Sequence, residues 1–241
     1  TFSKEQILLI CAVLGTTISP YLFFWQTSQE VEENILHGER TIAERRANSS
    51  RRSIRQMRID VWSGMAFSNL ITFFIFAACA GTLYANGITD IVTADQAALA
   101  LRPFGEFAFL LFALGIVGTG LLAVPVLAGS SAYAIAESLG WKYGLYRKLK
   151  QAYAFYGVII VSMLLGIAAN FAHLDPIKGL IYAAVANGII APFILFFVVR
   201  LSGNKGLMGE HANRPFTSAL GWVTIAIMAL SGIAAIGSMW F

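Results

Sequence analysis

Charged side chains are scarce in this chain of 241 residues. Asp, Glu, Lys and Arg make up 12% of the sequence, about half of what soluble domains carry, while 57% is hydrophobic. Six segments contain none of the four charged residue types: 6–29, 61–89, 107–136, 151–174, 179–199 and 215–241. Each is long enough for the roughly 20 helical residues that cross a bilayer. The composition excludes a soluble domain and predicts an all-α polytopic membrane protein with six transmembrane helices.

Residue patterns that mark a redox, catalytic or proton-carrying site are also missing. The two cysteines, Cys11 and Cys79, lie in apolar segments without CxxC spacing, so a disulfide framework is not supported. No nucleotide-binding loop, catalytic triad or paired carboxylates occur, and we expect neither enzymatic activity nor a cofactor. No acidic residue lies at the centre of a predicted span, so the chain alone offers no intramembrane proton relay.

The basic residues predict the orientation. Seven of the 17 Lys and Arg residues lie in 30–60, four in 138–150 and three in 200–214. Only Lys4, Arg102 and Lys178 fall elsewhere. The positive-inside rule places the loops 30–60, 138–150 and 200–217 in the cytoplasm and both chain ends outside. These loops account for the pI of 9.2 without a nucleic-acid partner.

The predicted organisation is a single transmembrane domain over residues 1–241. We expect an Arg-rich cytoplasmic loop over 30–60 and helices over about 6–29 (broken near 16–20), 61–85, 105–137, 152–172, 178–200 and 218–241. The chain begins with Thr and has no signal peptide. We therefore expect it to be part of a longer protein.

The first predicted span contains an interruption, Gly-Thr-Thr-Ile-Ser-Pro-Tyr over residues 15–21. Proline removes an amide donor and clashes with the preceding turn, so Pro20 breaks or kinks the helix. Irregular backbone is tolerated at membrane depth only where it is buried in protein or lines a cavity. In transporters such breaks hold substrates or ions, and the motif therefore predicts a solute or ion site.

A second span contains Asn-Gly-Ile-Ile-Ala-Pro-Phe over residues 187–193. It predicts another Pro/Gly-interrupted helix, with the Asn187 amide about one turn before Pro192. Two interrupted helices in one bundle favour a shared site between them. Asn69, an amide within 61–85, must also find a partner, either as interhelical glue or on a solute pathway.

These motifs resemble the natural resistance-associated macrophage protein (Nramp) family of divalent-metal transporters. Residues 15–21 are similar to the family's sixth-helix break, usually Gly-Ala-x-x-Met-Pro-His, and residues 187–193 to its tenth-helix motif. Residues 203–209 and Phe67-Ser68-Asn69 match further stretches. The resemblance implies helices six to eleven, that is, the second inverted repeat of the leucine-transporter fold plus one extra helix. The N-terminal helices, which carry an Asp-Pro-Gly motif, would then belong to the same protein in a bacterial inner membrane.

The resemblance also implies roles for individual residues. Thr16 falls where the family offers a backbone carbonyl to the metal, Ser19 on the methionine ligand, and Asn187 on an amide that joins the closed site. The positions that line or gate the pathway are Thr17, Pro20, Tyr21, Gln26 and Asn69. Tyr21 and Gln26 replace two histidines linked to proton movement, which makes transport without proton coupling an expectation.

The replacement of methionine by Ser19 changes the expected ion. A thioether favours transition metals, whereas hydroxyl and carbonyl oxygens suit Mg²⁺, Ca²⁺ and Mn²⁺. Small Ser and Thr side chains leave room for a partly hydrated Mg²⁺. We expect a divalent-cation transporter shifted toward hard ions, Mg²⁺ or Mn²⁺. Two alternatives stay open: an organic-solute symporter of the same fold, such as an amino-acid symporter, and a non-transporting half-transporter.

Overall fold

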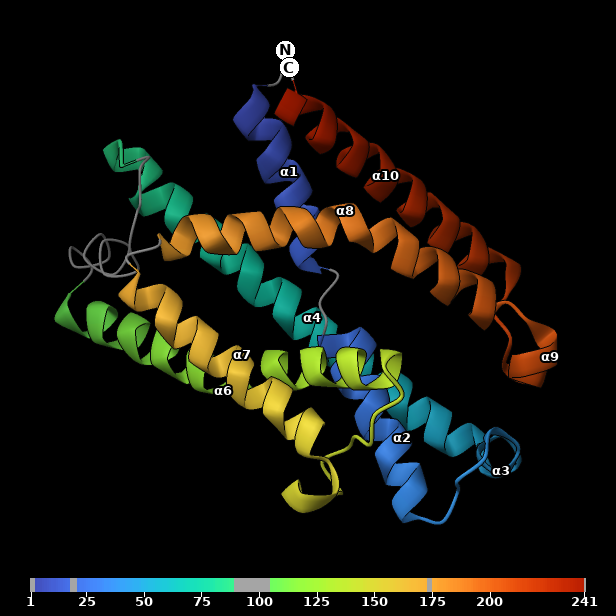
Figure 1. The fold of residues 1–241 in the computed structure, drawn as a ribbon. Helices are drawn as coiled ribbons and strands as arrows, with labels where there is room; N and C mark the ends of the chain where they lie inside the picture. Colours follow the sequence, from blue (N-terminus) through green and yellow to red (C-terminus); the bar gives the residue numbers. More distant parts are fainter. Residues whose placement is uncertain (1–2, 18–20, 89–104, 173–174, 241) are drawn as a thin grey trace. The chain divides into compact units, whose positions relative to one another are not determined.

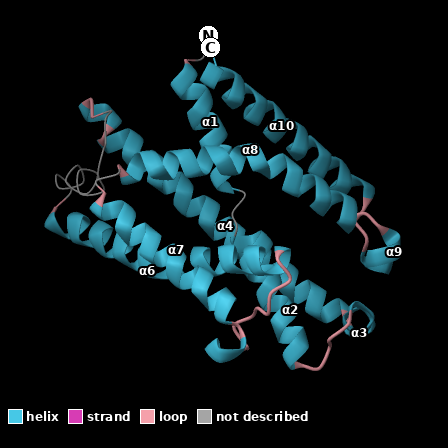
Figure 2. Cartoon of the chain, viewed as in Figure 1, coloured by secondary structure: helices cyan, strands magenta, loops and turns pink. Residues whose placement is uncertain are grey.

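The computed structural model describes residues 3–17, 21–88, 105–172 and 175–240. Within these ranges every regular element is a helix and none is a strand (Figure 2). Four helices are long and apolar enough to cross a membrane, namely Arg51–Thr82, Phe109–Ser138, Pro176–Ser202 and Pro215–Ser238. The prediction of an all-α integral membrane protein is thereby confirmed.

The α-helices that are described within the two remaining predicted spans are shorter. α1 (Lys4–Thr17) has 14 residues and is therefore about 21 Å long, less than the roughly 30 Å of a bilayer's hydrocarbon core. The apolar part of α7 (Tyr153–Phe171) covers Tyr153–Ala169. The count of six spans stays a prediction for these two segments.

The chain divides into two compact units, Thr1–Thr27 with Leu165–Phe241, and Ser28–Leu164. In the first unit, α1 contacts α8 (Pro176–Ser202) and α10 (Pro215–Trp240), and these two also contact each other (Figure 1). The short helices α9 (Lys205–Met208) and η5 (Gly209–His211) lie between α8 and α10 in the chain. The core of this unit consists mainly of small side chains: Cys11, Ala12, Ala184, Val185 and Ala235. Such residues let helix backbones approach closely in membranes.

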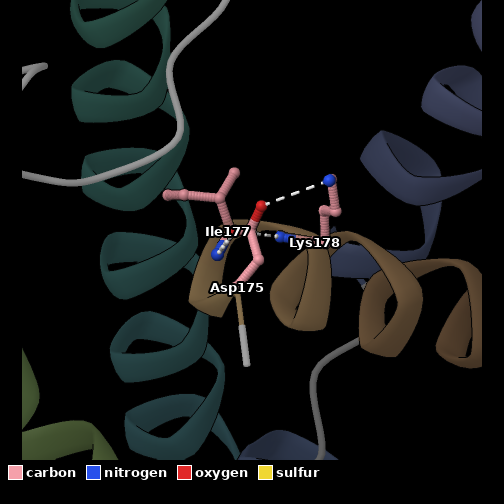
Figure 3. A network of polar contacts seen from close by, with 3 residues as sticks. All are labelled: Asp175, Ile177 and Lys178. Atoms are coloured by element: carbon pink, nitrogen blue, oxygen red, sulfur yellow. Dashed lines mark hydrogen bonds and ion pairs between the residues drawn. The ribbon is translucent and has the colours of Figure 1, made fainter. Parts of the chain in front are cut away.

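Asp175 determines where α8 begins. Its Oδ1 accepts hydrogen bonds from the backbone N–H groups of Ile177 at 3.0 Å and Lys178 at 3.1 Å (Figure 3). These donors, Lys178 first, lower the pKa of the carboxyl group, since hydrogen bonds to a carboxylate favour its charged form. Pro176 follows at the first helical position, where its missing N–H costs nothing.

The second unit contains the segment predicted as a loop over 30–60. The structure instead gives α2 (Thr27–Leu36), α3 (Ile42–Asn48) and the start of α4 (Arg51–Thr82). The reason is N-terminal capping. Thr41 and Glu44 form a capping box on α3, and the Ser50 hydroxyl accepts from the N–H of Ser53 at 3.0 Å on α4. The arginines of 51–58 therefore extend a membrane helix rather than a flexible linker.

The remaining elements of this unit are η2 (Tyr84–Asn86), α6 (Glu106–Ser138), η4 (Leu149–Gln151) and the first part of α7. α4 and α6 expose most of their apolar side chains. Phe67 is 66% exposed and Leu121 is 75% exposed. Apolar surface of this extent is what a helix presents to lipid or to further protein within a membrane.

Candidate functional site

The helical interruption predicted near 16–20 falls mostly on residues that the structure does not describe. α1 is described up to Thr17, and Ser19 and Pro20 lie outside the described residues. The chain is described again from Tyr21, as the π-helix η1 (Tyr21–Gln26), which leads directly into α2. π-Helical turns are rare and are found frequently at functional sites. The described backbone directly after the motif is thus π-helical rather than α-helical.

Thr16 lies in the last turn of α1. Its Oγ1 donates to the carbonyl of Val13 at 3.0 Å, so the hydroxyl proton is used within the helix. In a continuous α-helix the Thr16 carbonyl would accept from the N–H of residue 20. Residue 20 is proline and has no N–H. The main-chain carbonyl of Thr16 therefore lacks its usual helical donor, which suits it as a ligand for a cation.

α1 crosses α8 at two glycines. A Cβ atom placed on Gly15 would lie 2.1 Å from the Ala184 carbonyl oxygen and 2.5 Å from the Gly188 nitrogen. A Cβ placed on Gly188 would lie 2.6 Å from the Cys11 carbonyl oxygen. No side chain fits between the two backbones here. Because Thr16 follows Gly15 and Asn187 precedes Gly188, the crossing brings the segments that carry these two predicted ligands together.

The prediction that α8 is interrupted at its Pro/Gly motif is wrong. α8 runs unbroken from Pro176 to Ser202 with Pro192 inside it. Proline is tolerated in membrane helices where neighbouring groups compensate the lost hydrogen bond. Pro192 cannot donate to the carbonyl of Gly188, four residues earlier. α8 therefore offers its polar groups, including the half-buried Asn187, from a continuous helix.

The other predicted pathway residues are distributed over both units. Tyr21 and Gln26 are partly buried and begin and end the π-helix. Thr17 is the last residue of α1. Asn69 belongs to the second unit, where its Nδ2 donates to the Met65 carbonyl of its own helix at 2.9 Å. Asn69 thus satisfies its donor locally, as membrane amides must.

The glycine crossing was not predicted, although its signal is present in the sequence. Cys11 and Gly15 are four residues apart, and so are Ala184 and Gly188. Small residues at this spacing let membrane helices pack closely. Among the described residues no group of three or more His, Cys, Asp or Glu side chains could hold a metal ion.

These features define a helical membrane protein in which α1 packs closely against the continuous, proline-containing α8. The family model described as natural resistance-associated macrophage protein-like matches residues 1–238. The chain belongs to this family. Three similar proteins are named divalent metal cation transporters of the MntH type.

The relative from Mycobacterium leprae is 24% identical over 96% of this chain and 50% of its own length. The relative from Pseudomonas aeruginosa is 25% identical over 99% of this chain and 52% of its own length. A relative from Klebsiella pneumoniae is 26% identical over 98% of this chain and 52% of its own length. The chain therefore spans about half the length of the curated relatives it matches.

Gly188→Ala tests the crossing. Its methyl group would collide with backbone atoms of α1, and we expect it to lower the free energy of unfolding by about 1–3 kcal/mol. Gly179→Ala on the same helix is the matched control, since a Cβ there meets nothing within 4 Å. The measurement is thermal unfolding of the purified full-length protein in detergent. Equal stability of the two variants would contradict the close packing.

Proposed function

We propose that this chain is part of a membrane transporter that carries divalent metal cations through a site where α1 ends against α8. The family match and the printed names of the relatives support this proposal. The observation that carries it is the contact of Gly15 with Gly188. That contact holds the interrupted end of α1 and the Asn187 turn of α8 within one packed unit.

The proposed ligands are the Thr16 carbonyl, the Ser19 hydroxyl and the Asn187 side-chain oxygen. Thr17, Pro20, Tyr21, Gln26 and Asn69 would line or gate the pathway. All three ligands are hard oxygen donors, which suit Mg²⁺ and Mn²⁺ better than soft transition metals. Neutral ligands also leave the ion with several of its waters, as Mg²⁺ prefers. The cargo we propose is a partly hydrated hard divalent cation.

Transport is proposed to proceed without coupling to protons at this site. Tyr21 and Gln26 occupy the positions at which the resemblance implies histidines. Glutamine does not titrate, and a tyrosine hydroxyl has an ordinary pKa near 10, so neither exchanges protons readily near pH 7. We therefore expect a metal flux that does not change with the pH gradient across the membrane.

The proposed architecture is the second inverted repeat of the leucine-transporter fold with one extra helix. The other half of the site would come from N-terminal helices of the same protein, in keeping with relatives twice the length of this chain. The proposed location is a bacterial inner membrane, with the loops 30–60, 138–150 and 200–217 in the cytoplasm. The family match favours metal over the amino-acid symporter and the non-transporting subunit considered above.

Replacing Ser19 with Met tests the proposed ion preference. A thioether at this position softens the ligand set, so uptake should shift toward Mn²⁺ and Cd²⁺ relative to Mg²⁺ by about tenfold, equivalent to roughly 1.4 kcal/mol. The measurement is competitive uptake into proteoliposomes by the full-length protein. Ser19→Ala separates loss of the hydroxyl from gain of sulfur. An unchanged ion ratio in Ser19→Met would remove residue 19 from the ligands.

Replacing Asn187 with Ala tests the contribution of α8. Loss of one oxygen ligand should raise the KM for metal by about tenfold, because the cation keeps only its remaining partners. The control is Asn170→Ala, which removes the same amide from α7. Initial rates of uptake over a series of metal concentrations give KM for both variants. Equal effects at the two positions would contradict a role for Asn187 in the site.

A further inference from the structure

A buried carboxylate connects α2 to the turn between α6 and α7. Glu32 is only 5% exposed. Its Oε1 accepts from the hydroxyl of Tyr133 at 2.5 Å and from the N–H of Leu145 at 2.9 Å, and its Oε2 accepts from the N–H of Tyr146 at 3.0 Å. Two of these donors are backbone groups of the turn. The carboxylate therefore fixes the turn as well as the side chain of α6.

The surroundings of Tyr133 make this contact rigid. Tyr133 has no exposed surface, and its ring packs edge-on against the fully buried Phe155 of α7, with ring centres 4.8 Å apart. Its hydroxyl also accepts from Nε2 of Gln29 at 3.0 Å. Gln29 and Glu32 are three residues apart and lie on one face of α2. One turn of α2 thus binds the same tyrosine twice.

The turn is shaped for the carboxylate by Gly144. Its φ of +119° is a conformation that side chains rarely adopt, and a Cβ there would lie 2.8 Å from Oε1 of Glu32. Glycine lets the backbone approach the carboxylate and direct the next two N–H groups at it. Aligned backbone donors of this kind suit an anion.

We propose that Glu32 is a positioning residue that fixes α2, which directly follows the π-helix, onto the turn between α6 and α7. Its role in transport rests on the proposed function, whereas the attachment itself does not. α2 and the turn then move as one body during the transport cycle. A glutamine cannot replace Glu32. Its Nε2 is a donor and would face a backbone N–H, also a donor, where a carboxylate oxygen now accepts.

Hydrogen–deuterium exchange of the full-length protein tests the attachment without any transport assay. In Glu32→Gln, the N–H groups of Leu145 and Tyr146 should exchange about tenfold faster, because a buried donor that loses its acceptor costs enough free energy for such a change. Glu33→Gln is the matched control, since Glu33 is the next residue of α2 and is exposed. Unchanged exchange in Glu32→Gln would overturn the proposal.

Tyr133→Phe provides a second variant that keeps the packed ring and removes only the hydroxyl. It should accelerate exchange of the same N–H groups less than Glu32→Gln does, since both backbone donors retain their acceptor. Tyr153→Phe, at a 63% exposed position of α7, should leave exchange unchanged. Faster exchange in the Tyr153 variant, or none in the Tyr133 variant, would count against the network as described.

Uptake kinetics then connect the attachment to transport. If Glu32 positions α2 without touching metal, Glu32→Gln should lower the maximal rate of uptake and leave KM unchanged. A raised KM with an unchanged maximal rate would place Glu32 at the metal instead and overturn its positioning role. Wild-type protein without metal uptake would refute the proposed function, while the exchange experiment would still decide the attachment.

Discussion

A carbonyl group at membrane depth needs a hydrogen-bond donor or a cation, because lipid supplies neither. Pro20 and Pro192 have no N–H, so the carbonyls four positions earlier, on Thr16 and Gly188, lose their usual helical donor. On the Thr16 side, α1 is described up to Thr17, and the chain is next described as the π-helix Tyr21–Gln26. At Gly188 the helix continues. Both carbonyls belong to residues at, or next to, the crossing of α1 and α8.

Close packing makes the position of these groups definite. Gly15 and Gly188 lie at the point where α1 and α8 touch, and a methyl group on either would meet backbone atoms. Rotation or sliding of one helix past the other is restricted by such contact. The continuous α8 therefore acts as a fixed surface against which the end of α1 is held.

The sequence predicts some of this organisation and misses the rest for physical reasons. Low charge and apolar length predict the helical membrane class. Pro192 misleads, because a proline within a membrane helix breaks it or is tolerated depending on neighbouring groups that lie far away in sequence. α4 begins at Arg51 because Ser50 caps it. This capping signal is local, and the many arginines around it favour a solvated loop, so the sequence does not predict the helix start. Glu32 could not be predicted, since its partners Tyr133, Leu145 and Tyr146 are about a hundred residues away.

Locating the ion is the most direct measurement of the central claim. Anomalous diffraction from crystals of the full-length protein grown with Mn²⁺ would reveal where the cation binds. We expect one peak within about 2.5 Å of the Thr16 carbonyl oxygen, with the Asn187 side chain facing it. A Mn²⁺ peak elsewhere in the membrane-spanning region, with the Thr16 carbonyl bonded to another protein group, would contradict the site.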